Sequence, residues 1–116
     1  MLRTVSWQYS DLPARLAEAE IDQLVLCADD SWRFDIIPVA ERACRFIKGE
    51  LERGDGGVLV HCYGGVNRSG AVCAAFLATE LSIPLYEAVL RLRQVRGTVL
   101  KNETFIKELV RHCSRK

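Results

Sequence analysis

The feature that most constrains this chain is a short apolar run followed by a glycine-containing loop and then small apolar residues, all within residues 57–81. Residues 58–60, Val-Leu-Val, predict a buried β-strand because the run is continuously apolar. The loop contains Gly64 and Gly65, and residues 71–78 are apolar enough for a buried helix. In a strand, loop and helix of this order, backbone N–H groups converge where the helix dipole is positive. The pattern therefore predicts an anion-binding site.

Two side chains at the ends of this loop indicate what chemistry the site can perform. Cys62 begins the loop and Arg68 ends it, with five residues between them. A guanidinium can bind two phosphate oxygens at once, and a cysteine that faces amide N–H groups at a helix N-terminus loses its proton easily. A thiolate at Cys62 is then placed to attack phosphorus. Ser69 is expected to cap the helix and to donate its hydroxyl to the sulfur. The alternative, an inert cysteine beside a glycine turn, does not account for the joint pattern.

The sequence of residues 61–70, HCYGGVNRSG, resembles the signature of the cysteine-based protein phosphatases. That signature is His-Cys, five residues, arginine, and serine or threonine. Glycine three residues after the cysteine and the Arg-Ser ending are most similar to the dual-specificity branch. The resemblance runs from about residue 29 to residue 109, some two-thirds of the chain. It implies a three-layer α/β domain with a small, mostly parallel central sheet flanked by helices.

The resemblance also implies an enzyme mechanism, that of a cysteine-dependent phosphoric monoester hydrolase. Cys62, Arg68, Asp30 and Ser69 form its catalytic set. Cys62 forms a cysteinyl-phosphate, and Asp30 first protonates the leaving oxygen and then acts as base toward water. Arg68 and the loop N–H groups bind the equatorial oxygens. The phosphate-binding residues are Tyr63, Gly64, Gly65, Val66, Asn67 and Arg68. No metal or organic cofactor is implied.

The general acid is the least determined member of this set. Two adjacent acids after a strand, Asp29 and Asp30, would ordinarily form a solvated turn. Relatives place the acid about thirty residues before the cysteine, ahead of an amphipathic helix, and Asp30 lies 32 residues before Cys62. Asp29 remains the rival, and Asp35 is the next candidate.

Supporting roles are expected for His61, Arg96 and Asn102. Relatives have an Arg…Asn…Phe pattern in this region, whose arginine and asparagine brace the phosphate loop. Arg96 and Asn102 match it, although one more residue than expected separates Arg96 from Phe105. His61 could tune the thiolate or could simply be a core histidine.

The remaining pattern predicts the other elements. They are a short edge strand at residues 4–7, a helix at 12–20, a strand at 21–27, a helix at 39–51 after Pro38, a helix from Pro84 to Gly97, and a helix at 104–112 capped by Asn102. Dual-specificity phosphatases commonly carry two or three further strands before residue 21. The expected sheet is therefore shortened at its N-terminal side, with three to five strands.

Composition indicates one domain over residues 1–116, because this length allows a single core. The net charge of +1 gives no electrostatic case for nucleic acid or a membrane as partner. Five cysteines at irregular spacing indicate a reducing compartment rather than a disulfide framework. The longest apolar run, residues 71–78, is too short to span a membrane. We therefore expect a cytoplasmic or nuclear monomer whose partner is a phosphoprotein substrate. Cys27 or Cys73 is a candidate to form a disulfide with oxidised Cys62, and the alternative is that both cysteines only pack in the core.

The sequence leaves several substrate classes open. The short chain favours a shallow pocket that accepts phosphotyrosine as well as phosphoserine and phosphothreonine. Phosphoinositides are less favoured because the loop contains no lysine, and RNA 5′-phosphates find no support in the net charge. A non-catalytic phospho-binding module is the alternative from another class. Rhodanese-like sulfur transfer is disfavoured because that loop is usually one residue shorter.

Overall fold

Our computed structural model describes residues 3–7, 23–26, 31, 33–54, 57–62, 67–97 and 99–114. In chain order they form β1 (Arg3–Trp7), β2 (Gln23–Leu26), α2 (Ile37–Glu52), β3 (Val58–Val60), α3 (Arg68–Thr79), α4 (Leu85–Arg96) and α5 (Glu103–Ser114). The predicted helix at residues 12–20 lies outside the described residues.

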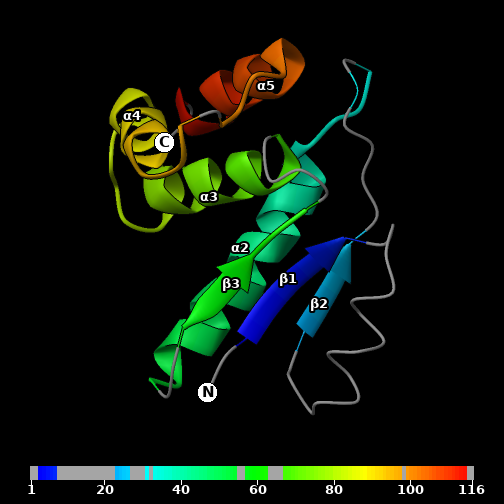
Figure 1. Cartoon of the computed structure of the whole chain (residues 1–116), viewed down its shortest axis with the longest axis vertical. Coiled ribbons are helices and arrows are strands. Elements are labelled where there is room, and N and C mark those ends of the chain that lie inside the picture. Colours follow the sequence, from blue (N-terminus) through cyan, green and yellow to red (C-terminus); the bar gives the residue numbers. More distant parts are fainter. Residues whose placement is uncertain are drawn as a thin grey trace.

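The three described strands are parallel and stand in the order β2-β1-β3 (Figure 1). The predicted α/β fold with a parallel sheet is thereby confirmed. The edge position predicted for residues 4–7 is wrong, because β1 pairs with both neighbours, Val5 facing Leu24 on one side and Val60 on the other. Parallel neighbours need a crossover connection, and the segment containing α2 carries the chain from β2 past β1 to β3.

β3 is less buried than its apolar sequence predicts. It lies at the edge of the described sheet, and Leu59 is 49% exposed, whereas Val58 and Val60 are partly buried. Alternate residues of a strand face opposite sides of the sheet, so only one side of β3 packs against the helices. All three strands point the same way, and the residues that follow β3 therefore leave the carboxyl edge of the sheet, where α/β proteins place their ligands.

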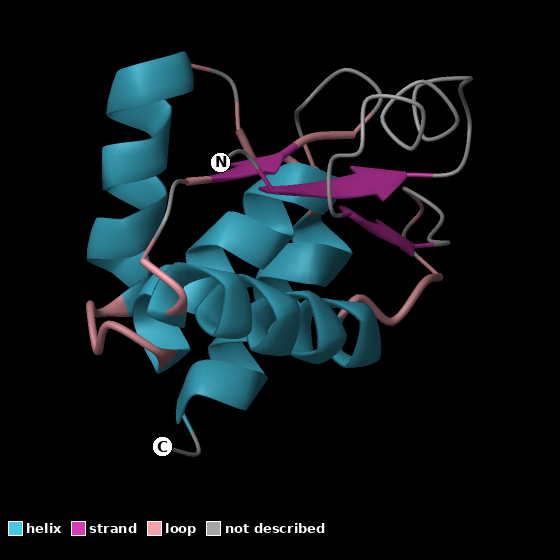
Figure 2. Ribbon diagram, turned by 90° about the horizontal axis from the view of Figure 1, so that it is seen from below, coloured by secondary structure: helices cyan, strands magenta, loops and turns pink. Residues whose placement is uncertain are grey.

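α2 packs against all three strands and begins the helical layer. Its buried residues, Ala40, Ala43, Cys44 and Ile47, recur at the spacing of one helix face. Pro38 lies in its first turn as predicted, and the Asp35 carboxylate accepts the Ile37 N–H at 3.1 Å. Figure 2 shows the sheet with the helices gathered mainly on one face.

α3 runs through the middle of the helical layer and packs against α2, α4, α5 and β3. Its first eight residues are buried except Cys73, which is partly buried, and they include Ala71, Val72, Ala74 and Ala75. A helix surrounded on most sides needs small apolar residues nearly all round. The small-residue pattern of this segment thus has a packing cause.

The loop between α4 and α5 is held close to the start of α3. Gly97 ends α4 with a φ of 78°, and Leu100 has a φ of 59°, a left-handed conformation that costs a leucine roughly 1–2 kcal/mol. Leu100 is 1% exposed, so burial offsets that cost. Arg93 donates from Nε to the Val99 carbonyl at 3.1 Å and from Nη2 to the Leu100 carbonyl at 3.2 Å. Burial and these two bonds together hold the loop in its strained conformation.

Gly70 allows α3 to approach this loop closely. A Cβ at Gly70 would lie 2.7 Å from Val99 Cγ1 and 3.3 Å from the Leu100 nitrogen. An alanine here would force Val99 or the Leu100 backbone to shift, so glycine fits this crossing without overpacking.

In the described part of the chain, no helix combines the length and apolar character needed to cross a membrane.

Candidate active site

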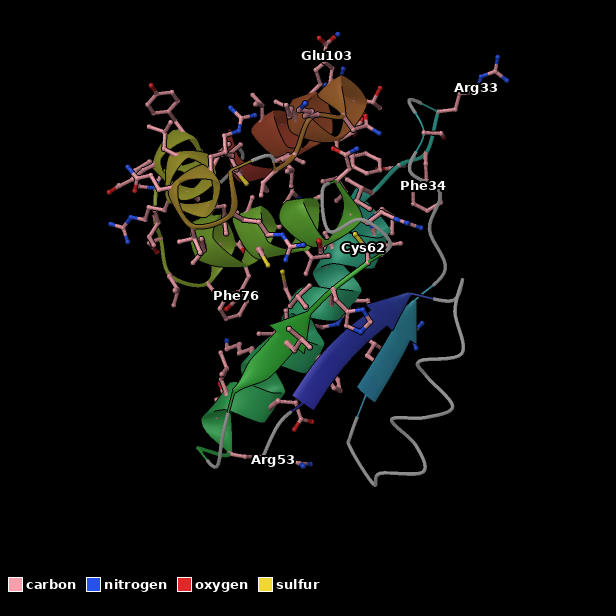
Figure 3. The ribbon with its side chains drawn as sticks, in the orientation of Figure 1. Arg33, Phe34, Arg53, Cys62, Phe76 and Glu103 are labelled. Carbon is pink, nitrogen blue, oxygen red and sulfur yellow. The ribbon has the colours of Figure 1, made fainter. Side chains whose placement is uncertain are left out.

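Cys62 lies just beyond the C-terminal end of β3 and close to the N-terminal end of α3 (Figure 3). Phe34 lies at the same end of the molecule, whereas Arg53 lies at the opposite end. The strand, loop and helix order predicted from residues 57–81 is present as β3 and α3. The loop positions Tyr63, Gly64, Gly65 and Val66 lie outside the described residues.

Ser69 contacts the cysteine sulfur through two groups. Its backbone N–H donates to Cys62 Sγ at 3.4 Å, and its Oγ lies 3.3 Å from the same sulfur. The first N–H groups of a helix have no partner inside the helix, so the Ser69 N–H is available to the sulfur. Both groups can donate to a thiolate, and the positive end of the α3 dipole lies beside it.

Ser69 does not cap α3, contrary to the prediction. The helix begins at Arg68, and Asn67 is its N-cap residue. Ser69 therefore lies inside the first turn, where its hydroxyl reaches the sulfur rather than a backbone N–H.

Arg68 is buried, with 7% of its surface exposed, in the first turn of α3. Burying a guanidinium is unfavourable unless polar groups accept its N–H donors. A buried arginine beside a cysteine at a helix N-terminus is suited to an anion with several oxygens, which its planar fork can bind in two places.

Hydrogen bonds join Asn67, the N-cap residue of α3, to the loop before α5. Its Oδ1 accepts the Lys101 N–H at 2.7 Å and the Asn102 N–H at 2.8 Å. The Asn67 side-chain oxygen is thus occupied by two backbone N–H groups of the same chain. The predicted contact of Asn67 with phosphate, through its backbone, stays a prediction.

Asn102 caps α5, as predicted. Its Oδ1 accepts the Thr104 N–H at 3.0 Å and the Phe105 N–H at 3.2 Å. Its Nδ2 also donates to the Ser31 carbonyl at 3.2 Å. Its backbone N–H donates to Asn67 Oδ1 at 2.8 Å. The predicted bracing of the phosphate loop by this asparagine stays a prediction.

Arg93, rather than Arg96, makes the contacts to the α4–α5 loop that the structure describes. Arg96 is exposed at the end of α4 and lines a cavity of about 140 Å³ together with Ser69 and Gly70. Its supporting role stays a prediction. The sequence gives no signal for this role of Arg93, because Arg93 lies three positions farther from Phe105 than Arg96, which is already one residue too far from Phe105 for the family pattern.

Two neighbours of the sulfur have altered acidity. Burial lowers the pKa of His61, which disfavours the positively charged form of its ring. Burial, and to a lesser degree the charge of Cys62, raises the pKa of Cys73 to about 11. The Cys73 thiol therefore keeps its proton at neutral pH.

Of the three candidate acids, Asp35 lies among the described residues and Asp29 and Asp30 lie outside them. Asp35 is exposed, and its Oδ1 accepts the first N–H of α2. This carboxylate therefore serves the start of α2. Among the described residues, no three His, Cys, Asp or Glu side chains are grouped so that they could hold a metal ion.

A cavity of about 430 Å³ lies away from the sulfur, between α4 and α5. Apolar side chains line most of it, and it includes neither Cys62 nor Arg68. The candidate site is therefore identified by its reactive side chains, Cys62 and Arg68, and not by the largest of these cavity volumes.

Comparison with known families gives a match over nearly the whole chain. A family model described as "Dual specificity phosphatase, catalytic domain" matches residues 4–115. A Dictyostelium discoideum protein named as a probable dual specificity protein phosphatase is 37% identical over 83 residues, which cover 72% of this chain and 21% of that protein. Human dual specificity protein phosphatase 26 is 34% identical over 83 residues, which cover 72% of this chain and 39% of that protein. The chain thus spans about a fifth to two fifths of the length of these curated relatives.

Solved structures share the fold at lower sequence identity. Human DUSP28 is 24% identical with a TM-score of 0.83, covering 98% of this chain and 74% of that chain. Tk-PTP in its active form is 22% identical with a TM-score of 0.83, covering 98% of this chain and 80% of that chain. The described strands and helices therefore belong to a fold that these phosphatase structures have in common with this chain.

Proposed function

Since this chain belongs to the dual specificity phosphatase family, we propose that it hydrolyses phosphate monoesters through a covalent intermediate on Cys62. The observation that carries the proposal is the arrangement around Cys62 Sγ. The N–H and the hydroxyl of Ser69 lie within 3.4 Å of the sulfur, and Arg68 is buried in the same helical turn.

In the first step the Cys62 thiolate donates an electron pair to phosphorus, and the bond from phosphorus to the leaving oxygen breaks. Asp30 gives its proton to that oxygen, so an alcohol or phenol departs rather than its anion. Arg68 and the N–H groups at the start of α3 stabilise the equatorial oxygens, where charge is concentrated in the transition state.

In the second step a water molecule attacks the phosphorus of cysteinyl-phosphate. The Asp30 carboxylate takes a proton from the water, and the bond from phosphorus to sulfur breaks with the electron pair returning to sulfur. The Ser69 hydroxyl, 3.3 Å from the sulfur, stabilises the departing thiolate. Inorganic phosphate leaves and the enzyme is regenerated.

The proposed substrates are phosphoproteins carrying phosphotyrosine, phosphoserine or phosphothreonine. Family membership supports phosphoprotein substrates in general, and the acceptance of both classes is proposed from the family's description as dual specificity phosphatases. We further propose that residues 1–116 act as one monomeric catalytic domain in the cytoplasm or nucleus. Phosphoinositides and RNA 5′-phosphates are the competing substrates to be tested beside phosphopeptides.

The proposal is tested by phosphate release from a simple aryl phosphate. The wild-type chain should release phosphate, Cys62→Ser should release none, and Cys113→Ser, a partly buried cysteine on α5, should match the wild type. The Cys62→Ser protein should still bind tungstate, a tetrahedral oxyanion, because the N–H groups and Arg68 are unchanged. Appreciable turnover by Cys62→Ser would exclude the covalent mechanism. Binding of a phosphopeptide by the wild type without phosphate release would favour the non-catalytic module instead.

The acid is tested separately with two leaving groups. Asp30→Asn should slow hydrolysis of a phosphotyrosine peptide by ~10²–10⁴-fold, the usual contribution of general acid catalysis. It should slow a fluorinated aryl phosphate far less, because that phenolate leaves without a proton. Asp29→Asn is the matched control. If Asp29→Asn shows this selectivity instead, the assignment is shifted by one residue.

A further inference from the structure

The groove between α4 and α5 has no part in the chemistry proposed for Cys62. The two helices pack against each other and against α3, on the side of α3 that faces away from the sheet (Figure 1). The groove has a volume of about 430 Å³. Cavities that bind small organic molecules usually have volumes of ~300–1,000 Å³. The groove is therefore large enough for a small organic ligand.

The walls of the groove are mostly apolar and partly open to solvent. Leu85 and Val89 come from α4, and Ile106 and Val110 come from α5. Each pair has the i, i+4 spacing of neighbours on one helix face, so two apolar stripes line the groove. Val110 is 49% exposed, and Tyr86, which also lines the groove, is 78% exposed. An apolar body that covered these side chains would remove apolar surface from water, which is favourable.

In the described lining of this groove, Arg93 is the one charged side chain. Its Nε and Nη2 donate to the Val99 and Leu100 carbonyls, which are neutral and leave its charge uncompensated. The neighbouring Arg91, by contrast, pairs with Glu87 at 2.8 Å. No carboxylate in the part of the chain that the structure describes forms an ion pair with Arg93. A guanidinium has five N–H donors, so donors remain for an anion.

The charge of Arg93 decides what kind of molecule the groove suits. A wholly apolar occupant would remove water from the guanidinium and supply no counter-charge, which is unfavourable. A carboxylate on the occupant would supply that charge, and its two oxygens match the planar fork of an arginine. A phosphate dianion is less suited, because the lining offers one cation among mostly apolar side chains.

We propose that the groove between α4 and α5 binds a small amphipathic anion, with its apolar body between the two helices and one carboxylate on the Arg93 guanidinium. The inference goes beyond the proposed function and does not depend on it, because the lining of the groove includes neither Cys62 nor Arg68.

The test uses two fluorescent probes with the same apolar body. Anilinonaphthalene sulfonate carries one anionic group, and phenylnaphthylamine carries none. In fluorescence titrations of the wild-type chain, the sulfonate should bind more tightly by roughly 10-fold or more, the range for a hydrogen bond to a charged group. Decanoate should displace the sulfonate probe, whereas decanol, which has the same chain length and no charge, should displace it far less.

Two variants test the residues that define the site. Val110→Glu, at a half-exposed position of α5, places a carboxylate where it can pair with Arg93 and repel an anion. It should weaken binding of the sulfonate probe much more than binding of the uncharged probe. Arg93→Gln should reduce the affinity for the sulfonate probe to that for the uncharged probe. Arg91→Gln, on an exposed arginine outside the lining, is the matched control and should bind both probes as the wild type does.

Thermal unfolding of each variant is measured beside the titrations, because Arg93→Gln also alters the bonds to the Val99 and Leu100 carbonyls. Val110→Glu leaves those bonds in place, so it tests the site even if Arg93→Gln fails to fold.

Three results would overturn the inference. The first is no binding, or equal affinity for the two probes in the wild type, since a groove that takes any apolar body would suit an apolar protein surface instead. The second is unchanged affinity for the sulfonate probe in Val110→Glu, which would place the probe elsewhere. The third is displacement of the sulfonate probe by tungstate, which would place it at Cys62. None of these results bears on phosphate release, so the proposed function is tested separately.

Discussion

At the scale of single residues, the reactive sulfur depends on Ser69 twice, through its N–H at 3.4 Å and its hydroxyl at 3.3 Å. Ser69→Ala removes only the hydroxyl. Hydrogen bonds to charged groups are worth about 1.5–3 kcal/mol, so departure of the thiolate should slow by roughly 10–100-fold. We expect a burst of phenol release from an aryl phosphate followed by a slow steady rate, measured by stopped-flow. A mutant without a burst, slowed equally in both phases, would contradict the role of the hydroxyl.

Arg68 should tolerate no substitution, even by another cation. An ammonium cannot reproduce the two parallel N–H bonds of a guanidinium, and losing one donor to a developing oxyanion typically costs ~10²–10³-fold in kcat. We expect Arg68→Lys to fall by at least that factor in phosphate release. Arg91→Lys, on an exposed arginine of α4 that pairs with Glu87, is the control and should lose much less. Near-normal rates for Arg68→Lys would mean that the loop binds its anion in another way.

At the scale of elements, the crossing of α3 with the α4–α5 loop depends on Gly70. A Cβ there would lie 2.7 Å from Val99 Cγ1, and overpacking of this kind typically costs ~1–3 kcal/mol. Gly49, on α2, has open space around its Cβ direction. Replacing a helical glycine by alanine in open space stabilises by roughly 0.5–1 kcal/mol. Thermal unfolding should therefore place Gly70→Ala below the wild type and Gly49→Ala above it. The same sign for both variants would contradict the packing described for Gly70.

α3 also carries Cys73. Burial raises the pKa of the Cys73 thiol to about 11 from its ordinary value of 9.0. The folded state thus keeps a proton that the unfolded chain releases. The stability from this group is present below pH 9 and is lost as the pH rises toward 11. Because burial keeps this thiol protonated at neutral pH, Cys73 is a poor nucleophile toward oxidised Cys62. Mass spectrometry after mild peroxide should find no disulfide between Cys62 and Cys73, and finding one would contradict this. The other candidate, Cys27, lies outside the described residues.

At the scale of the whole molecule, local patterns in the sequence predicted the described strands and helices well. The helix predicted at residues 12–20 lies outside the described residues. Pro38, Pro84, Gly97 and Asn102 mark helix ends through local backbone chemistry, and each lies where the pattern placed it. The strand before Cys62 and the helix after the loop are also present, because the apolar run from Val58 to Val60 and the small apolar residues of α3 are local features of the sequence. The loop positions 63–66 between them lie outside the described residues. The family match over residues 4–115 agrees with the resemblance found in the loop.

Long-range arrangement was harder to predict. The central place of β1 follows from the crossover between β2 and β3, which no local pattern reveals. The contacts of Arg93 depend on the left-handed backbone at Leu100, an unusual conformation for a leucine. The hydrogen bond from the Asn102 side chain to the Ser31 backbone carbonyl joins residues that are 71 positions apart in the sequence. Such contacts form only when the loop between α4 and α5 is packed in place, so no regular spacing of residue types along the sequence predicts them.

The central claim is that Cys62 carries the phosphoryl group during turnover. The most direct measurement is acid quenching of the wild-type chain during hydrolysis of an aryl phosphate, followed by mass spectrometry of its peptides. We predict one added phosphate group on the peptide containing Cys62, at a level that rises in Ser69→Ala and vanishes in Cys62→Ser. Steady phosphate release with no phosphate on Cys62 in either the wild type or Ser69→Ala would contradict the account.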